Sequence, residues 1–415
     1  MESTAPASLL RDGGMVMTNG SITAVGPGDD LERRFPFAIM HDLGDAVVLP
    51  GLVNAHVHLE LSNQSPGTPP GRFVDWVMAL IRRTAATGGD ERAQARAVAE
   101  AVQIGVDQCL RFGVTTVGDI SRLCALTRPL LGSYPIRVVS YGEVAAMAQR
   151  RGLLGERLAV AADVSQTTSR LRVGISPHAP YSVEPDGYRK CIALAQERHL
   201  PLATHLAETP DEALFLHEHG GPLRELWAFL GAWDDQVPRF VGGPIHLMHA
   251  LGLLDRRKAL LAHVNYCDDA EMDLLASTGQ GGASVVYCPR THAYFGHPPH
   301  RWREMLARGI NVAIGTDSCA SSPDLNLVDD LRLLHRLAPE VPASSLWEMA
   351  TIRAARAIGM DGEVGTLAPG KAADCVAFRV RDADDPLSEA LEAEALPFEV
   401  WIAGVKSGED DRVTR

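Results

Sequence analysis

Short apolar runs alternate with longer amphipathic stretches through the middle of the chain. Eight runs have the pattern of strands, at residues 52–58, 115–120, 136–144, 171–176, 202–206, 259–264, 283–288 and 311–315. Helical patterns lie between most of them, such as residues 91–111, 185–199, 268–277 and 300–308. This alternation predicts parallel strands joined by right-handed crossovers. Eight such units in roughly 250–310 residues are what a closed (β/α)8 barrel requires. An open doubly wound sheet is the alternative, but no glycine-rich phosphate-binding pattern follows the first strand.

Both ends of the chain have a different pattern, with short strand-like pieces between glycine-containing turns. Residues 21–25 form one such piece near the N-terminus, and residues 375–378 and 398–404 form two near the C-terminus. The fold class we expect is therefore α/β: a TIM barrel with a small composite β-sandwich built from both chain ends. The expected parts are residues 1–50 (sandwich), 51–360 (barrel) and 361–415 (sandwich).

Two connections are longer than the others. Residues 61–90 contain an amphipathic segment at 73–81, and residues 209–258 contain helical patterns at 212–219 and 222–233. Long loops at the active face of a barrel are often lids or pocket walls. Contacts in a homodimer are the alternative role, and the sequence leaves it open.

The composition of the chain argues against some classes of binding partner. The 415 residues carry a formal net charge of -13, which argues against nucleic acid or an anionic membrane as a partner. No apolar run is long enough to span a bilayer, and residues 1–6 lack the basic start and apolar core of a signal peptide. The seven cysteines are scattered and never form Cys-x-x-Cys, as expected for reduced thiols in a cytoplasm.

Five histidines and an aspartate stand at the C-terminal ends of the predicted strands. His56 and His58 share one face of the first strand, because strand side chains repeat with period two. Later strand ends add four more polar residues in chain order: His178, His205, His263 and Asp317. Barrel enzymes assemble their active sites at this end of the strands. A single histidine on an apolar strand is usually a packed core residue, but packing does not account for this repetition.

The pattern favours metal-assisted hydrolysis. Three imidazoles and one carboxylate suit a divalent ion with one position left for water. We expect one ion, zinc, with iron(II) or manganese(II) as alternatives. A bound metal lowers the pKa of its water toward neutrality. Glu208 follows His205 by three residues and is placed to move protons between this water and a substrate. His263 is placed to orient the water or to stabilise developing charge.

At this point the sequence resembles the amidohydrolase superfamily. The pieces that carry the resemblance are residues 50–58 (PGLVNAHVH), 113–116 (GVTT), 205–209 (HLAET), 262–264 (AHV), 315–318 (GTDS) and 365–374 (GTLAPGKAAD). They span nearly the whole chain. The closest likeness is to the branch that contains adenosylhomocysteine, guanine and related nucleobase deaminases together with triazine chlorohydrolases. The resemblance implies a metal held by His56, His58, His205 and Asp317. It also implies that Glu208, His263 and Asp317 are catalytic.

The sequence departs from this family in two places. Members with two metals bridge them with a modified lysine after strand four, whereas this chain has Ser176-Pro177-His178 there, so we expect one metal. Glu143, at the end of strand three, is expected to be a supporting or structural carboxylate rather than an additional ligand.

The loop after strand seven, residues 288–297, differs from the asparagine-rich loop of the related deaminases. Arg290 and His292 in this loop are candidates to bind an anionic or oxygen-rich part of the substrate. An ion pair between Arg290 and a neighbouring acid is the alternative. His178 and Trp76 match positions that line the substrate pocket in the related deaminases, although a tryptophan on an amphipathic helix is more often a packing residue.

The first hypothesis for function is an aminohydrolase. In it, hydroxide formed at the metal attacks a ring carbon that bears an amine, and ammonia leaves an aminated N-heterocycle such as a purine, pyrimidine, pteridine or nucleoside. The second keeps the same site but changes the leaving group, giving a chlorohydrolase or a cyclic amide or imide hydrolase. The third is a non-catalytic assembly protein, which should have lost ligands that this chain retains. The zinc fold of cytidine deaminases is excluded, because its Pro-Cys-x-x-Cys motif is absent.

Overall fold

Eight parallel strands form the central sheet of the computed structural model, which describes residues 9–69, 71–85, 90–381, 384–393 and 395–407. Their bounds are β4 (Leu52–Val57), β5 (Val114–Ser121), β6 (Arg137–Val144), β7 (Leu171–Pro177), β8 (Leu202–Leu206), β9 (Ala259–His263), β10 (Ser284–Tyr287) and β11 (Val312–Ile314). Neighbours in the sheet follow chain order from β4 to β11. All eight predicted strands are present, with bounds within two residues of those expected.

The two edges of this sheet meet, so the strands curve into a barrel. Val57 at the end of β4 forms a parallel bridge with Asp317, just after β11. Buried residues from strands around the barrel, among them Val53, Val139 and Leu260, form one core cluster with residues of α15 (Ile352–Ala357). A larger cluster packs the strands against the surrounding helices. The predicted fold class, a TIM barrel with a sheet made from both chain ends, is confirmed.

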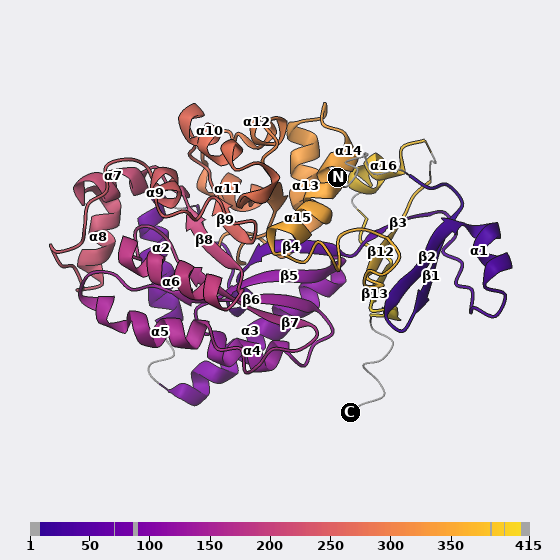
Figure 1. The fold of residues 1–415 in the computed structure, drawn as a ribbon, viewed down its shortest axis with the longest axis horizontal. Coiled ribbons are helices and arrows are strands. Elements are labelled where there is room, and N and C mark those ends of the chain that lie inside the picture. The colour runs from indigo at the N-terminus through magenta and orange to yellow at the C-terminus, as the bar shows by residue number, and fades with distance from the viewer. Residues whose placement is uncertain (1–8, 70, 86–89, 382–383, 394, 408–415) are drawn as a thin grey trace.

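Helices follow the strands on the outside of the barrel (Figure 1). They are α3 (Glu91–Arg111), α4 (Cys124–Leu131), α5 (Leu154–Ala161), α6 (Pro185–Glu197), α10 (Asp269–Ser277), α11 (Pro289–Phe295), α12 (Trp302–Ala307), α13 (Leu327–Leu337) and α14 (Ala343–Met349). The predicted helix at 91–111 has the bounds of α3, which begins where Asp90 accepts hydrogen bonds from the N–H groups of Arg92 and Ala93. No helix among the described residues is both long and apolar enough to cross a bilayer.

The two long connections carry helices of their own. Residues 61–90 contain α2 (Phe73–Ala85), and residues 209–258 contain α7 (Asp211–Glu218), α8 (Gly221–Phe229) and α9 (Pro244–Ala250). Aromatic residues of these helices, Phe73, Phe215 and Trp227, form a third core cluster together with Tyr181 after β7. The long connections therefore pack against one another and against the C-terminal end of the barrel.

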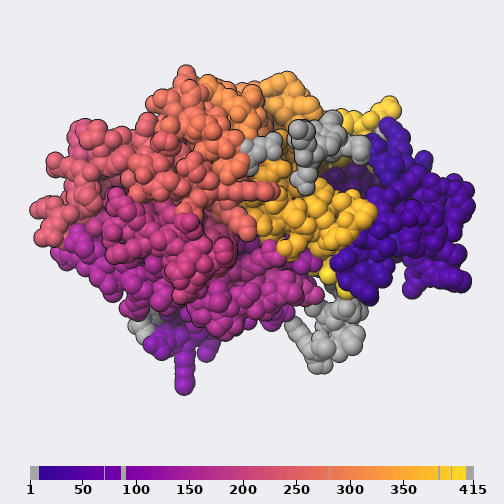
Figure 2. All heavy atoms as spheres, viewed as in Figure 1, coloured from indigo at the N-terminus to yellow at the C-terminus, as the bar shows by residue number. Residues whose placement is uncertain are grey.

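Segments from the two chain ends share sheets, as expected. The four-stranded antiparallel sheet has the order β14 (Val405–Lys406), β13 (Glu399–Ile402), β12 (Cys375–Arg379) and β3 (Ala46–Pro50). The hairpin of β1 (Gly13–Thr18) and β2 (Ser21–Pro27), followed by α1 (Gly28–Arg34), joins the C-terminal part through a hydrogen bond from the N–H of Ile22 to the carbonyl of Lys371 (2.8 Å). Helix α16 (Pro386–Glu392) lies between β12 and β13 in the chain. Figures 1 and 2 show the indigo and yellow segments together at one end of the molecule.

The boundaries between these parts, at residues 50 and 360, stay a prediction. Residues 1–8 and 408–415, at the outer ends of the expected sandwich parts, lie outside the described residues, and so does the N-terminal segment interpreted as lacking a signal peptide.

Candidate metal centre and active site

Six of the polar side chains predicted from the strand ends gather at the C-terminal end of the barrel. They form two trios, each with its potential ligand atoms within 4.8 Å of one another: His56, His58 and His205, and then Glu208, His263 and Asp317. The two trios are adjacent, because Oδ1 of Asp317 lies 3.5 Å from Nε2 of His58 and 3.8 Å from Nε2 of His56.

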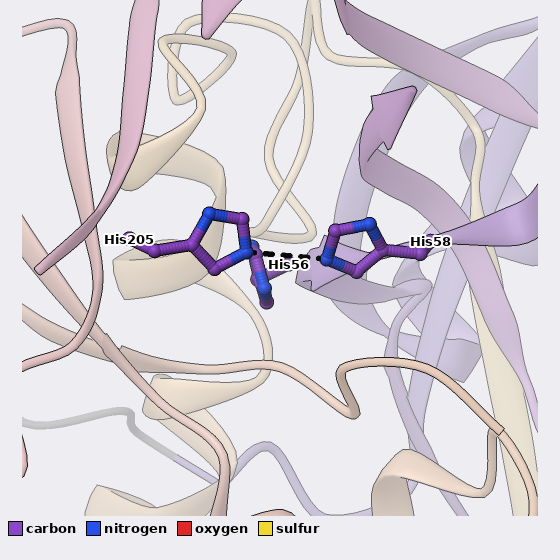
Figure 3. A group of neighbouring side chains, drawn as sticks. All are labelled: His56, His58 and His205. Atoms are coloured by element: carbon purple, nitrogen blue, oxygen red, sulfur yellow. Dashed lines mark hydrogen bonds between the residues drawn. The ribbon is translucent and has the colours of Figure 1, made fainter. Parts of the chain in front are cut away.

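The three imidazoles of the first trio face a common point (Figure 3). Nε2 of His205 and Nε2 of His58 are 3.3 Å apart. Nδ1 of His205 lies 3.1 Å from the carbonyl oxygen of His178, so it carries the proton and leaves the lone pair on Nε2. Two nitrogens bound to zinc at about 2.0–2.1 Å with tetrahedral angles would be about 3.3 Å apart. The separation of these nitrogens therefore fits two ligands of one metal ion.

His56 gives a second test of the fit to a metal. Its side chain is fully buried, and neither ring nitrogen has a hydrogen-bond partner among the described residues. A buried polar atom without a partner costs about 1–3 kcal/mol. A cation between His56 and Asp317 would remove this cost, so the donor set fits a divalent ion.

Burial keeps the imidazoles of the site neutral. It lowers the pKa of His58 and of His205 to about 3, and the pKa of His178 to about 4, with neighbouring positive groups adding to the effect. The pKa values of His56 and His263 lie well below the usual value for the same first cause. Neutral imidazole is the form that binds metals, so these side chains need not lose a proton to do so at neutral pH.

The carboxylates have the opposite shift. Burial raises the pKa of Asp317, although the N–H of Ser318 and the hydroxyl of Ser321 donate to its two oxygens. Burial raises the pKa of Glu208 well above its usual value, and the nearby Asp317 and Glu212 add to this. Oε1 of Glu208 lies 3.6 Å from Nε2 of His263. A carboxyl group with a raised pKa releases its proton less readily, and such shifts are common at catalytic acid–base groups.

Left-handed backbone conformations turn several of these residues into the site. The φ angles are 49° at Ala207, 74° at His263, 51° at Val264 and 57° at Asp317. Residues other than glycine rarely adopt them, and each costs on the order of 1–3 kcal/mol. Such strain is held where the surrounding structure requires a particular side-chain direction, and here it directs the ends of β8, β9 and β11 toward one point.

Glu212 is a site residue that the sequence analysis missed. It is fully buried at the start of α7, and its carboxylate accepts hydrogen bonds from the main-chain N–H groups of Ala207 (3.1 Å), Glu208 (2.7 Å) and Thr209 (3.4 Å). The pattern Thr209-x-x-Glu212, typical of a capping box, is the signal that could have drawn attention to it.

His178 and Glu143 lie beside the histidine trio. The ring of His178 is 5.0 Å from that of His205, and its Nδ1 is hydrogen bonded to the hydroxyl of Ser182 (2.6 Å). Oε2 of Glu143 is 4.0 Å from Nε2 of His178, and Glu143 is in neither trio. The role of Glu143 as a supporting carboxylate stays a prediction.

Trp76 of α2 is held against the loop that follows Asp317. Its Nε1 donates to the carbonyl of Ala320 (3.1 Å), and its ring contacts Phe295 edge-on, with ring centres 5.2 Å apart. Phe73 lies between this pair and Tyr181, which itself contacts His178. The aromatic residues thus connect the predicted pocket positions Trp76 and His178.

Arg290 forms ion pairs with neighbouring acids, which the sequence analysis gave as the alternative to substrate binding. Its guanidinium forms ion pairs with Asp330 (3.0 Å) and Asp324 (2.7 Å) and donates to the carbonyls of Asp324 and Asn326. Asp330 is fully buried. These contacts use the planar donor edge of Arg290, so the geometry favours a link between α11 and α13 over contact with a substrate.

His292 is also engaged by the protein. The side chain is buried, and Nε2 donates to the carbonyl of Pro298 (2.9 Å). Its ring lies 5.4 Å from those of Tyr287 and His297. The structure does not bring His292 into either trio, and its role in substrate binding stays a prediction.

Known proteins resemble this chain over almost its full length. The model of the amidohydrolase family matches residues 47–405. A 5-methylthioadenosine/S-adenosylhomocysteine deaminase of Nitratidesulfovibrio vulgaris is 31% identical over 99% of this chain and 91% of the relative. An aminodeoxyfutalosine deaminase of Deinococcus radiodurans is 29% identical over 84% of this chain and 81% of its own. A solved adenosine deaminase of Xanthomonas campestris with bound zinc superposes with a TM-score of 0.77 at 24% identity, covering 97% of this chain and 89% of that one.

Proposed function

The chain belongs to the amidohydrolase family, and we propose that it is a metal-dependent aminohydrolase that releases ammonia from a 6-aminopurine nucleoside derivative. It is a hydrolase that acts on carbon–nitrogen bonds other than peptide bonds. The observation that carries the proposal is the placement of Glu208 and His263, 3.6 Å apart, directly beside the three converging imidazoles.

We assign the metal to His56, His58, His205 and Asp317, with one ion per chain and zinc as its identity. The converging nitrogens, the unpartnered ring of His56 and the nearby carboxylate support this assignment. Zinc is bound in the Xanthomonas campestris adenosine deaminase, and the same donor set also suits iron(II) or manganese(II). When bound, a divalent ion supplies a water that is activated near neutral pH.

The protein's own groups move the protons. Glu208 takes a proton from the attacking water and delivers it to the ring nitrogen next to the carbon that bears the amine. His263, with an unpartnered buried Nε2 among the described residues, stabilises the charge that develops on the added oxygen. The remaining hydroxyl proton passes through Glu208 to the amino group, which leaves as ammonia. The products are then the ring carbonyl compound and ammonia, and water is the only other reactant.

Two sides of the site suit two parts of a nucleoside. His178 and Glu143 provide polar groups beside the metal ligands, suited to ring nitrogens and hydroxyl groups. Trp76, Phe73 and Phe295 provide an aromatic side, suited to an apolar substituent or a ring face. The names of the two deaminase relatives refer to adenosine derivatives and to aminodeoxyfutalosine. They support a substrate with both a polar part and an apolar part. All seven cysteines are free, which supports a cytoplasmic location.

Ammonia release from the zinc-loaded protein tests the proposal. The panel contains adenosine, 5-methylthioadenosine and S-adenosylhomocysteine, with aminated pyrimidines and pteridines as comparison rings. We expect ammonia and the matching ring carbonyl product from at least one adenosine derivative, with a lower kcat/KM for the other rings. Chloride release from chlorinated heterocycles without ammonia release from any amine would replace the aminohydrolase by a chlorohydrolase.

A further inference from the structure

The backbone that carries Glu208 is fixed from two directions. On one side, its carbonyls accept hydrogen bonds from the segment after β9: the N–H of Tyr266 donates to the carbonyl of Ala207 (3.2 Å), and the side-chain amide of Asn265 donates to the carbonyl of Glu208 (3.1 Å). These bonds tie the end of β8 to the strand end that provides His263.

On the other side, the N–H groups of the same segment point at one buried carboxylate. Oε1 of Glu212 accepts from Glu208 (2.7 Å) and Thr209 (3.4 Å), and Oε2 accepts from Ala207 (3.1 Å). In these three hydrogen bonds both oxygens act as acceptors. Among the described residues, no Lys, Arg or His forms an ion pair with this carboxylate within 4.0 Å, and its hydrogen-bond partners are these main-chain donors.

We propose that Glu212 is a positioning residue that sets the direction of the Glu208 side chain; this rests on the proposed function of Glu208 as the proton carrier. Ala207, directly before Glu208, has a φ of 49°, which an alanine does not adopt without support. The carboxylate of Glu212 supplies that support, because it gathers three successive N–H groups that no strand or helix satisfies.

Glutamine at position 212 should fail in this role, although it has nearly the same shape. The side-chain amide of glutamine has one oxygen, which accepts hydrogen bonds, and one NH2 group, which only donates them. The NH2 group would take the place of one carboxylate oxygen and would then face a main-chain N–H, which is also a donor. The segment would then move to relieve the clash, and Glu208 would move with it. A displacement of about 1 Å at a reacting group costs on the order of 10²-fold in rate.

The first measurement compares hydrogen exchange in Glu212→Gln and in the matched control Glu218→Gln, an exposed glutamate on the same helix. We expect faster exchange of the N–H groups at 207–209 in Glu212→Gln and no change in Glu218→Gln. Unchanged exchange at 207–209 in Glu212→Gln would overturn the proposal. This measurement uses no substrate, so it is independent of which reaction the protein catalyses.

The second measurement is a double-mutant cycle with Glu208→Gln, with metal content and KM determined for each protein. Glu212→Gln should lower kcat on the order of 10²-fold in the wild-type background and less than about threefold in the Glu208→Gln background. Metal content and KM should stay close to wild type. An equal loss in both backgrounds would mean that Glu212 only stabilises the fold, and would overturn the proposal.

If Glu212→Gln is too unstable to purify, Glu212→Asp takes its place, because it keeps the charge but withdraws the carboxylate by one methylene group. We expect Glu212→Asp to show the same faster exchange at 207–209 and the same loss of kcat, each by a smaller amount. Failure of the proposed function has a different signature: the wild-type protein would release no ammonia from the panel, while exchange at 207–209 would still depend on Glu212.

Discussion

The main-chain N–H of Asp317 donates a hydrogen bond to the carbonyl oxygen of His56, at 3.1 Å. Asp317 follows the last strand of the barrel and His56 stands in the first. One of the hydrogen bonds that close the barrel therefore joins two residues assigned to the metal. Barrel closure and ligand placement share this contact between the first and last strands, which we call the seam. A change that opens the seam should therefore also weaken metal binding.

Gly315 lies at the seam, and a substitution there tests this relationship directly. A Cβ atom at this position would lie 2.6 Å from the carbonyl oxygen of His56 and 2.8 Å from its Cβ. Gly315→Ala should therefore lower the free energy of unfolding by about 1–3 kcal/mol, as overpacking does, and should also reduce bound metal. Gly362→Ala is the control, since a Cβ there has no atom within 4 Å. A Gly315→Ala protein with normal melting temperature and metal content would contradict this account of the seam.

The assigned ligands predict a definite metal stoichiometry. Purified protein should contain about one divalent ion per chain, as expected for a site of this donor number. His205→Ala should lose most of the metal, because it removes one of the two nitrogens that lie 3.3 Å apart. Glu143→Gln is the comparison and should keep it. Elemental analysis of the three proteins checks this, and a reproducible value near two that falls to one in Glu143→Gln would show that Glu143 holds a second ion.

The sequence predicted which polar side chains gather at the end of the barrel, because each stands at the end of a strand with a regular pattern. His56 and His58 follow from period two, and His205 and Asp317 follow from their places after apolar runs. The partner of Arg290 could not be found in the same way. Asp330 is forty positions further along the chain and lies on a helix, and only the packing of α11 against α13 brings the two together.

Arg290 should act on stability and not on substrate affinity. Arg290→Met would leave the fully buried Asp330 without its cation, which costs about 3–5 kcal/mol of unfolding free energy. Arg336→Met, at an exposed arginine on the same helix as Asp330, should change stability by about 0.5 kcal/mol or less. Chemical denaturation measures the effect on stability, and KM measures the effect on substrate affinity. A tenfold or greater rise in KM of Arg290→Met at normal stability would show that Arg290 contributes to substrate binding.

Asp119 should make stability depend on pH. It is fully buried, its Oδ1 accepts from the N–H of Leu59 (3.0 Å), and burial raises its pKa to about 7. Between pH of about 4 and about 7 the folded protein keeps a proton that the unfolded chain releases. The stabilising contribution of this proton is present at low pH and is lost as the pH rises through the folded-state pKa.

Asp119→Asn should remove this dependence, because the amide oxygen still accepts from Leu59 and has no proton to lose. At about 1.4 kcal/mol per pKa unit, the free energy of unfolding of wild type relative to Asp119→Asn should fall by a few kcal/mol from about pH 4 to about pH 8. Denaturation curves across this range measure it, with Glu156→Gln as an exposed control. A constant difference between wild type and Asp119→Asn would show that Asp119 is ionised in the folded protein throughout.

Glu212 shows a second limit of sequence reasoning. A Thr-x-x-Glu pattern usually predicts a helix start, and α7 does begin within this stretch, at Asp211. What the pattern does not reveal is that the chain turns through a left-handed Ala207, so that the same carboxylate also reaches the N–H groups of Ala207 and Glu208. The local sequence predicts the start of the helix, whereas only the tertiary turn brings the carboxylate of Glu212 to the backbone of Glu208.

Glu208→Gln separates proton transfer from metal binding. Glu208 lies 3.6 Å from His263, and burial raises its pKa, which favours a carboxyl group that can hold a proton it has taken and then give it up. Glutamine has nearly the same shape but cannot cycle a proton. Glu208→Gln should therefore keep its metal and melting temperature and lose kcat by a factor on the order of 10²–10⁴. His205→Ala, by contrast, should lose the metal itself. Near-normal turnover in a metal-replete Glu208→Gln protein would rule out Glu208 as the proton carrier, even with all four metal ligands correct.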